Sequence, residues 1–170
     1  MLFRSYDASM TMNRLLRHMS WANQRTFASI QGLPQQALDS SIVNSEWSAK
    51  HILQHIVSGA DWFAYWLTEA DWHDIKLPQE MSDVADIAKQ LADFDAVAIG
   101  ESERPDELIT RDVDGKLTTN LRSAVLAQAV HHATEHRAQL IDALEFKGYK
   151  PINLDDIDLW HFERFEKSQS

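Results

Sequence analysis

The sequence of 170 residues contains no cysteine, and this absence removes several kinds of chemistry. It excludes disulfide bonds, thiolate metal sites and a cysteine nucleophile, so any thiol in a reaction would have to arrive with a substrate. No uncharged apolar run of 18 residues occurs either, so the sequence predicts no membrane span. The first ten residues lack the continuous apolar region of a signal peptide, and we expect a cytoplasmic protein with no membrane partner.

Positive charge is also scarce along this chain. Lysine and arginine together number 16 against 26 aspartates and glutamates, which gives a formal net charge of −10. Residues 80–107 alone contain nine acidic and two basic residues. A negative field of this kind repels polyanions, so we expect no nucleic-acid partner.

Proline is infrequent, and its four positions (34, 78, 105 and 151) separate segments of helical periodicity. Apolar residues recur every three or four positions in these segments, which predicts helices over residues 9–32, 45–70, 82–100 and 119–147. Their wide apolar faces indicate an all-α four-helix bundle. The length fits one domain over residues 1–170, with a bundle core of about residues 10–150 and a C-terminal tail, 151–170, packed on it.

One short region departs from the helical pattern. Between residues 107 and 121, Asp114-Gly115 separates two segments that are rich in isoleucine, valine, leucine and threonine. Asp-Gly between β-prone residues is a hairpin turn signal. The sequence therefore predicts a small two-stranded β-hairpin before the last helix of the bundle.

Two histidines in that helix occupy positions where its apolar stripe should run. At spacings of three or four, the stripe contains Leu121, Val125, Ala129, His132, His136, Leu140 and Ala143. Because residues i and i+4 lie on one face of a helix, His132 and His136 can both reach one ion. The neighbouring His131 is rotated to another face, and we expect it at the surface.

The second predicted helix supplies a third inward histidine. Its apolar stripe contains Ile52, His55, Gly59, Trp62, Phe63 and Trp66, whereas His51 lies toward the polar edge. A lone H-x-x-x-H is weak evidence for a metal site, but three inward imidazoles need partners for all their ring nitrogens. A shared ion would satisfy His55, His132 and His136 together, and a hydrogen-bonded polar cluster is the alternative.

Two polar residues close to this pair also need an explanation. Arg137 lies in an apolar stripe, and we expect a structural ion pair, across a dimer or to an N-terminal acid, with binding of an anionic substrate as the alternative. Gln139 either hydrogen-bonds a ligand histidine or lies on the plain helix surface. Position 133 is alanine, so the general-base glutamate of H-E-x-x-H is absent, and no catalytic residue can be named.

These features together resemble the DinB family, also called the DinB/YfiT-like four-helix metalloproteins. That family combines a histidine seven or eight residues after a tryptophan, a strand-like turn with a central glycine, and a last helix with H-x-x-x-H-R-G-Q. The corresponding residues here are Trp47, His55 and Trp62, then Val113-Asp114-Gly115-Lys116, then His132 to Gln139. The family glycine after the arginine is Ala138 in this chain, which is still a small residue.

The resemblance implies an up-down-down-up bundle, a homodimer, and a divalent ion, zinc or nickel, held by His55, His132 and His136. Some relatives are thiol-dependent transferases or isomerases that use bacillithiol or mycothiol. Three histidine ligands leave an open position, as in catalytic zinc sites. We therefore expect a small-molecule substrate and a low-molecular-weight thiol or water activated there, in an S-transferase or a hydrolase. The alternatives are a metal-binding or stress-response interaction protein without turnover, and a plain bundle with core histidines.

Overall fold

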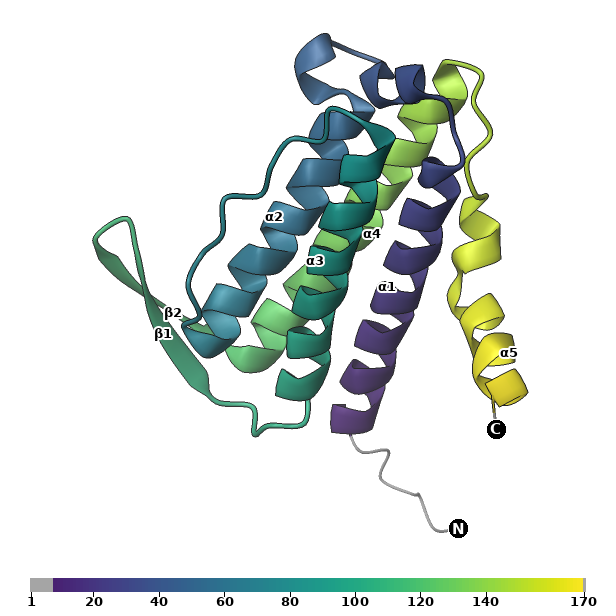
Figure 1. Ribbon diagram of the computed structural model, residues 1–170. Coiled ribbons are helices and arrows are strands. Elements are labelled where there is room, and N and C mark those ends of the chain that lie inside the picture. The colour runs from purple at the N-terminus through teal and green to yellow at the C-terminus, as the bar shows by residue number, and fades with distance from the viewer. Residues whose placement is uncertain (1–7, 170) are drawn as a thin grey trace.

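The computed structural model describes residues 8–169 and is mostly helical, as the sequence predicts (Figure 1). In chain order its elements are α1 (Ala8–Gln31), η1 (Gln35–Asp39), η2 (Ser45–Trp47), α2 (Ala49–Thr68), α3 (Met81–Glu101), β1 (Leu108–Val113), β2 (Lys116–Leu121), α4 (Arg122–Phe146), η3 (Leu154–Ile157) and α5 (Leu159–Gln169). The first four α-helices form the bundle, and the η elements are single 3-10 turns.

The four long helices are arranged up-down-down-up (Figure 1). Helix α1 packs against α3 and α4, and α2 packs against the same two helices, so α1 and α2 lie diagonally across the bundle. The chain between α2 and α3 runs back along the bundle, so these two neighbours are parallel (Figure 1). Helices α2 and α4 are antiparallel neighbours, which brings their histidine-bearing faces together.

The segment predicted as one helix over residues 45–70 is divided in the structure. The turn η2 and the helix α2 are separated at Ser48, whose backbone is extended. The side chain of Asn44 accepts a hydrogen bond from the backbone N–H of Trp47 at 3.0 Å, which caps the short turn. Trp47 is thereby held outside the helix and ahead of the stripe that carries His55.

The predicted hairpin is present as β1 and β2, which pair antiparallel from Leu108↔Leu121 to Val113↔Lys116. Asp114 and Gly115 both have positive φ, 53° and 79°, as the tight turn of a two-residue hairpin requires. Strand β2 continues to Leu121, so α4 starts three residues later than the expected start at residue 119.

The chain after Pro151 forms η3 and then α5, a helix that the sequence analysis did not anticipate. Both elements pack on α1, and Figure 1 shows α5 on the side of α1 that faces away from α2. His18 fixes this contact, because its Nε2 lies 2.8 Å from the carbonyl oxygen of Ile157 and its ring meets Phe162 edge-on.

The apolar core consists of two clusters separated by polar side chains. One contains Phe27, Ile56, Leu91 and Leu140, and the other contains Met19, Phe63, Ala98 and Ala133, so each bundle helix contributes to both. On α1, α3 and α4 polar residues lie between the two clusters, and His55 of α2 and His132 of α4 lie beside them. We call this set the polar layer, and it comprises Asn23, His55, Asp95, His132, His136 and Arg137.

Candidate metal centre

Three histidines that are far apart in the sequence meet at the edge of the polar layer. His55 comes from α2, and His132 and His136 come from successive turns of α4. One ring nitrogen of each lies within 4.8 Å of the corresponding nitrogens of the other two. The Nε2 atoms of His55 and His132 are 3.1 Å apart, and all three side chains are half-buried. The structure thus brings together the three residues that the sequence singled out.

Glycine at position 59 creates the space that the His132 ring fills. A Cβ atom at this position would lie 2.2 Å from Cε1 of His132 and 2.8 Å from each of its ring nitrogens. Gly59 is one turn after His55 on α2, so α4 can approach α2 closely where the histidines meet. Phe63, one further turn along, packs edge-on against the His132 ring with 5.6 Å between ring centroids.

Trp47 and Gln139 hold the other side of the cluster. The Trp47 ring lies edge-on to His55 and His136, with centroid distances of 5.2 and 5.7 Å. Oε1 of Gln139 accepts a hydrogen bond from Nδ1 of His136 at 2.9 Å and another from Nε1 of Trp47 at 3.2 Å. Because Nδ1 of His136 is occupied in this way, Nε2 is the nitrogen it can offer to the cluster.

The surroundings of His132 and His55 favour their neutral forms near pH 7. Burial, together with smaller effects of His136 and His55, lowers the pKa of His132 to about 4. Burial also lowers the pKa of His55, with His136 again adding to the effect. A neutral imidazole has a free nitrogen lone pair, which is the state that binds a metal ion.

The donor set fits a transition-metal ion. Imidazole suits zinc, nickel, copper and iron, and two nitrogen ligands at about 2.0–2.1 Å from one ion can lie 3.1 Å apart. The same distance also fits a hydrogen bond between His55 and His132, which is how a purely polar cluster would be arranged. Among the described residues only these three histidines form a group of this kind, so the protein would leave part of the coordination sphere open.

The two neighbouring histidines lie outside the cluster. His131 is exposed on α4, as expected. His51, one turn before His55, pairs with the hydroxyl of Ser48 at 2.8 Å from its Nδ1. The stripe positions therefore separate the three clustered histidines from His51 and His131.

Arg137 enters a buried network that the sequence analysis did not identify. Its guanidinium is 3% exposed and donates to Oδ1 of Asn23 at 2.6 Å and to the hydroxyl of Thr134 at 3.1 Å. The expected ion pair is not formed among residues 8–169, and Asp7, an N-terminal acid, lies outside them. The carboxylate that faces Arg137 is Asp95 on α3, to which Asn23 donates through Nδ2 at 3.0 Å.

Both charged ends of this network are strongly affected by burial. Burial raises the pKa of Asp95 to about 7, while the Asn23 hydrogen bond and the Arg137 charge act in the opposite direction. Burial lowers the pKa of Arg137 to about 10, so it stays charged at neutral pH. The sequence does indicate that Asp95 faces the core. It lies in an apolar stripe of α3, formed by Val84, Ile87, Leu91 and Ala98, with the same spacings of three and four as the histidine stripes.

Comparisons with known proteins agree with this arrangement. The model of the DinB family matches residues 8–167, a range that includes all three clustered histidines. A search of curated proteins finds no match to the chain. None of the helices described in residues 8–169 is long and apolar enough to cross a membrane. With nearly its whole length matched and the histidine cluster in place, this chain belongs to the DinB family.

Proposed function

We propose that this protein binds one divalent ion, zinc or nickel, through Nε2 of His55, His132 and His136, and uses the site to join an exogenous thiol to a small electrophile. The observation that supports this proposal best is the three-nitrogen cluster, for which the described residues provide no fourth ligand. Catalytic zinc sites keep a position open in this way, whereas structural sites are closed by four protein ligands.

A bound ion would supply Lewis acidity, which lowers the pKa of a thiol or a water molecule that enters the open position. The chain contains no cysteine, so the nucleophile would be a low-molecular-weight thiol, or water if the reaction is hydrolysis. The histidines hold the site, Gln139 and Trp47 fix the orientation of His136, and Phe63 packs edge-on against the ring of His132.

A groove beside the cluster is suited to the electrophile. It has a volume of about 400 Å³ and lies between α2, α4 and the hairpin, with Trp62, Phe63 and Trp66 among its lining residues. None of the three histidines lines it, but Gln128, one turn before His132 on α4, and Phe63, which packs on the His132 ring, both do. No charged side chain lines the groove, which favours a neutral, aromatic or apolar substrate.

The proposal is tested by turnover of a defined electrophile. Protein purified without a polyhistidine tag and loaded with zinc or nickel is mixed with 1-chloro-2,4-dinitrobenzene and, in turn, glutathione, cysteine, bacillithiol and mycothiol. We expect thiol-dependent release of chloride that disappears in His132→Ala and persists in His131→Ala, the adjacent exposed histidine.

Binding without turnover is the second function that the cluster could serve. Trp47 covers one side of His55 and His136, which also fits a protein that senses or stores the ion. One ion per chain together with no reaction for any thiol, and none for ester substrates, would support this alternative over the enzyme. The same preparations, analysed by sedimentation with and without the ion, test the expected homodimer.

A further inference from the structure

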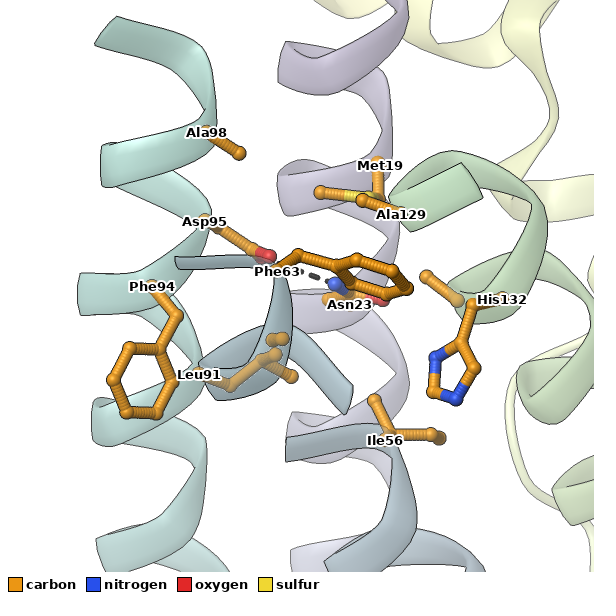
Figure 2. Close-up of a pocket in the computed structure, with 12 residues that line it drawn as sticks. Met19, Asn23, Ile56, Phe63, Leu91, Phe94, Asp95, Ala98, Ala129 and His132 are labelled. Carbon is orange, nitrogen blue, oxygen red and sulfur yellow. Dashed lines mark hydrogen bonds between the residues drawn. The ribbon is translucent and has the colours of Figure 1, made fainter. Parts of the chain in front are cut away.

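A small cavity lies inside the bundle, and His132 of the histidine cluster lines it (Figure 2). All four bundle helices line it, and it leaves about 10 Å³ for the centre of a water molecule, which is room for roughly one. Most of its wall is apolar, with Met19, Ile56 and Phe63 among the residues that form it. Three polar side chains, Asn23, Asp95 and His132, interrupt that wall.

Asp95 is the least satisfied of these polar groups. Its side chain is 1% exposed, and Oδ2 accepts the hydrogen bond from Asn23. Its other oxygen, Oδ1, is buried and makes no hydrogen bond of good geometry in the part of the chain that the structure describes, although the Ser20 side chain lies near enough to oppose the rise in the pKa of Asp95. In Figure 2 the carboxylate points from α3 into the interior. A buried acceptor left unpaired is costly, so a donor is expected to reach it.

His132 has a ring nitrogen that also lacks a partner. Its Nε2 faces His55, and within residues 8–169 no hydrogen bond is made by Nδ1. Figure 2 shows the His132 ring on the opposite side of the cavity from Asp95, with a ring nitrogen turned toward the interior between Phe63 and Ile56. A histidine that ligates a metal ion through one nitrogen usually donates from the other to a carboxylate, a carbonyl or a water molecule.

We propose that one water molecule occupies this cavity, accepts a hydrogen bond from Nδ1–H of His132 and donates one to Oδ1 of Asp95. Asp95 is then a positioning residue of the metal centre, acting through water on one of its ligands. This role of Asp95 rests on the proposed metal binding, whereas the hydrogen-bonded water would be present with or without the ion. It accounts for two unpaired polar groups with one molecule that the cavity can hold.

The water would fix the tautomer of His132. With the proton on Nδ1, Nε2 carries its lone pair toward His55 and the cluster. The polar layer would then be connected across the bundle, from His132 through the water to Asp95, and onward through Asn23 to Arg137. Hydrogen bonds at His132 and at Arg137 would then hold both ends of the helical turn that carries the two α4 histidines.

The test uses two variants that act on the water in different ways. Asp95→Asn removes the carboxylate while keeping its shape, and Ala98→Val fills the cavity wall without changing any polar group. The control is Asp61→Asn, since Asp61 is equally buried on α2 but both its oxygens are paired with His73. Two readouts are measured: zinc affinity by competition with a chelator, and the ring ¹⁵N shifts of His132 in the metal-free protein.

We expect the metal-free wild type and Asp61→Asn to show His132 protonated on Nδ1, with a cross-peak from that proton to water. In Asp95→Asn and in Ala98→Val the cross-peak should be lost, the tautomers should mix, and zinc affinity should fall about tenfold. Unchanged His132 shifts and zinc affinity in Ala98→Val would overturn the proposal even if Asp95→Asn failed to fold. If the wild type bound no zinc but kept the cross-peak, the water would stand and the proposed function would fail.

Discussion

His55 and His132 are 77 residues apart in the sequence, yet their Nε2 atoms lie 3.1 Å apart between α2 and α4. This contact depends on the antiparallel pairing of the two helices and on the missing side chain at Gly59. Two lone pairs cannot face each other at that distance, so either a proton or a cation lies between them.

The close approach at Gly59 should be essential for the cluster. Gly59→Ala would place a Cβ atom 2.2 Å from the His132 ring, which must then move away from His55. We predict at least a tenfold loss of zinc affinity, measured by chelator competition, with helical content retained. Gly100→Ala is the matched control, because its Cβ would meet nothing within 4 Å and alanine favours a helix by about 0.5–1 kcal/mol. Equal zinc affinity in both variants would contradict the prediction.

The orientation of His136 should depend on Gln139. Gln139→Leu removes the oxygen that accepts from Nδ1 of His136 and from Nε1 of Trp47. Loss of such a partner typically costs about 10- to 100-fold in metal affinity, and we predict a decrease in that range. Gln139→Glu keeps an acceptor at the same place and should retain the affinity. If leucine and glutamate behaved alike, His136 would not need this contact.

Much of this arrangement could be predicted from the sequence, because periodicity shows which side of a helix is buried. The stripes identified His55, His132 and His136 and set aside His51 and His131. Asp-Gly indicated the hairpin for an equally local reason, namely the positive φ that its turn requires.

The remainder depended on long-range packing that no local pattern encodes. The contact between Asn23 and Arg137 joins residues 114 positions apart, and neither residue type specifies the other. Asp95 was visible as a polar residue in an apolar stripe, but its partner on α1 was not. The docking of α5 through His18 was hidden for the same reason, because it depends on a carbonyl oxygen 139 residues away.

Acid should destabilise the metal-free protein through His132. Burial lowers the pKa of His132 to about 4 in the folded state, whereas the unfolded chain titrates near the ordinary value of 6.5. Between these values the unfolded state binds more protons, so this contribution to the free energy of unfolding is complete above about pH 6.5 and decreases as the pH falls toward 4.

His132→Leu removes the titration of His132. Asp95 titrates in both proteins, and its raised pKa acts on stability in the opposite direction over the same pH range, so the difference between the variant and the wild type reports His132 alone. We predict that urea unfolding with a chelator present shows the variant gaining stability relative to the wild type between about pH 7 and about pH 5. His131→Gln, at an exposed position, should show no such gain. Parallel pH profiles for the wild type and His132→Leu would refute the assignment.

The groove next to the cluster should determine affinity for an aromatic electrophile. Trp62 lines it and stacks on Tyr65, with ring centroids 5.5 Å apart, so Trp62→Leu removes an aromatic wall without changing charge. We predict a KM for 1-chloro-2,4-dinitrobenzene raised about 5- to 20-fold, as expected for a lost stacking surface of roughly 1–2 kcal/mol. The bound metal should be unchanged. Trp160→Leu, at an exposed position on α5, should leave KM unaltered.

The most direct test of the account is the metal content of protein purified without a polyhistidine tag. Elemental analysis together with native mass spectrometry gives the number and identity of ions per chain. We predict one divalent ion per chain in the wild type and in His131→Ala, and none in His55→Ala, His132→Ala or His136→Ala. A metal-free wild type after incubation with zinc and with nickel, or an ion that survives all three substitutions, would contradict the claim that this cluster is a metal centre.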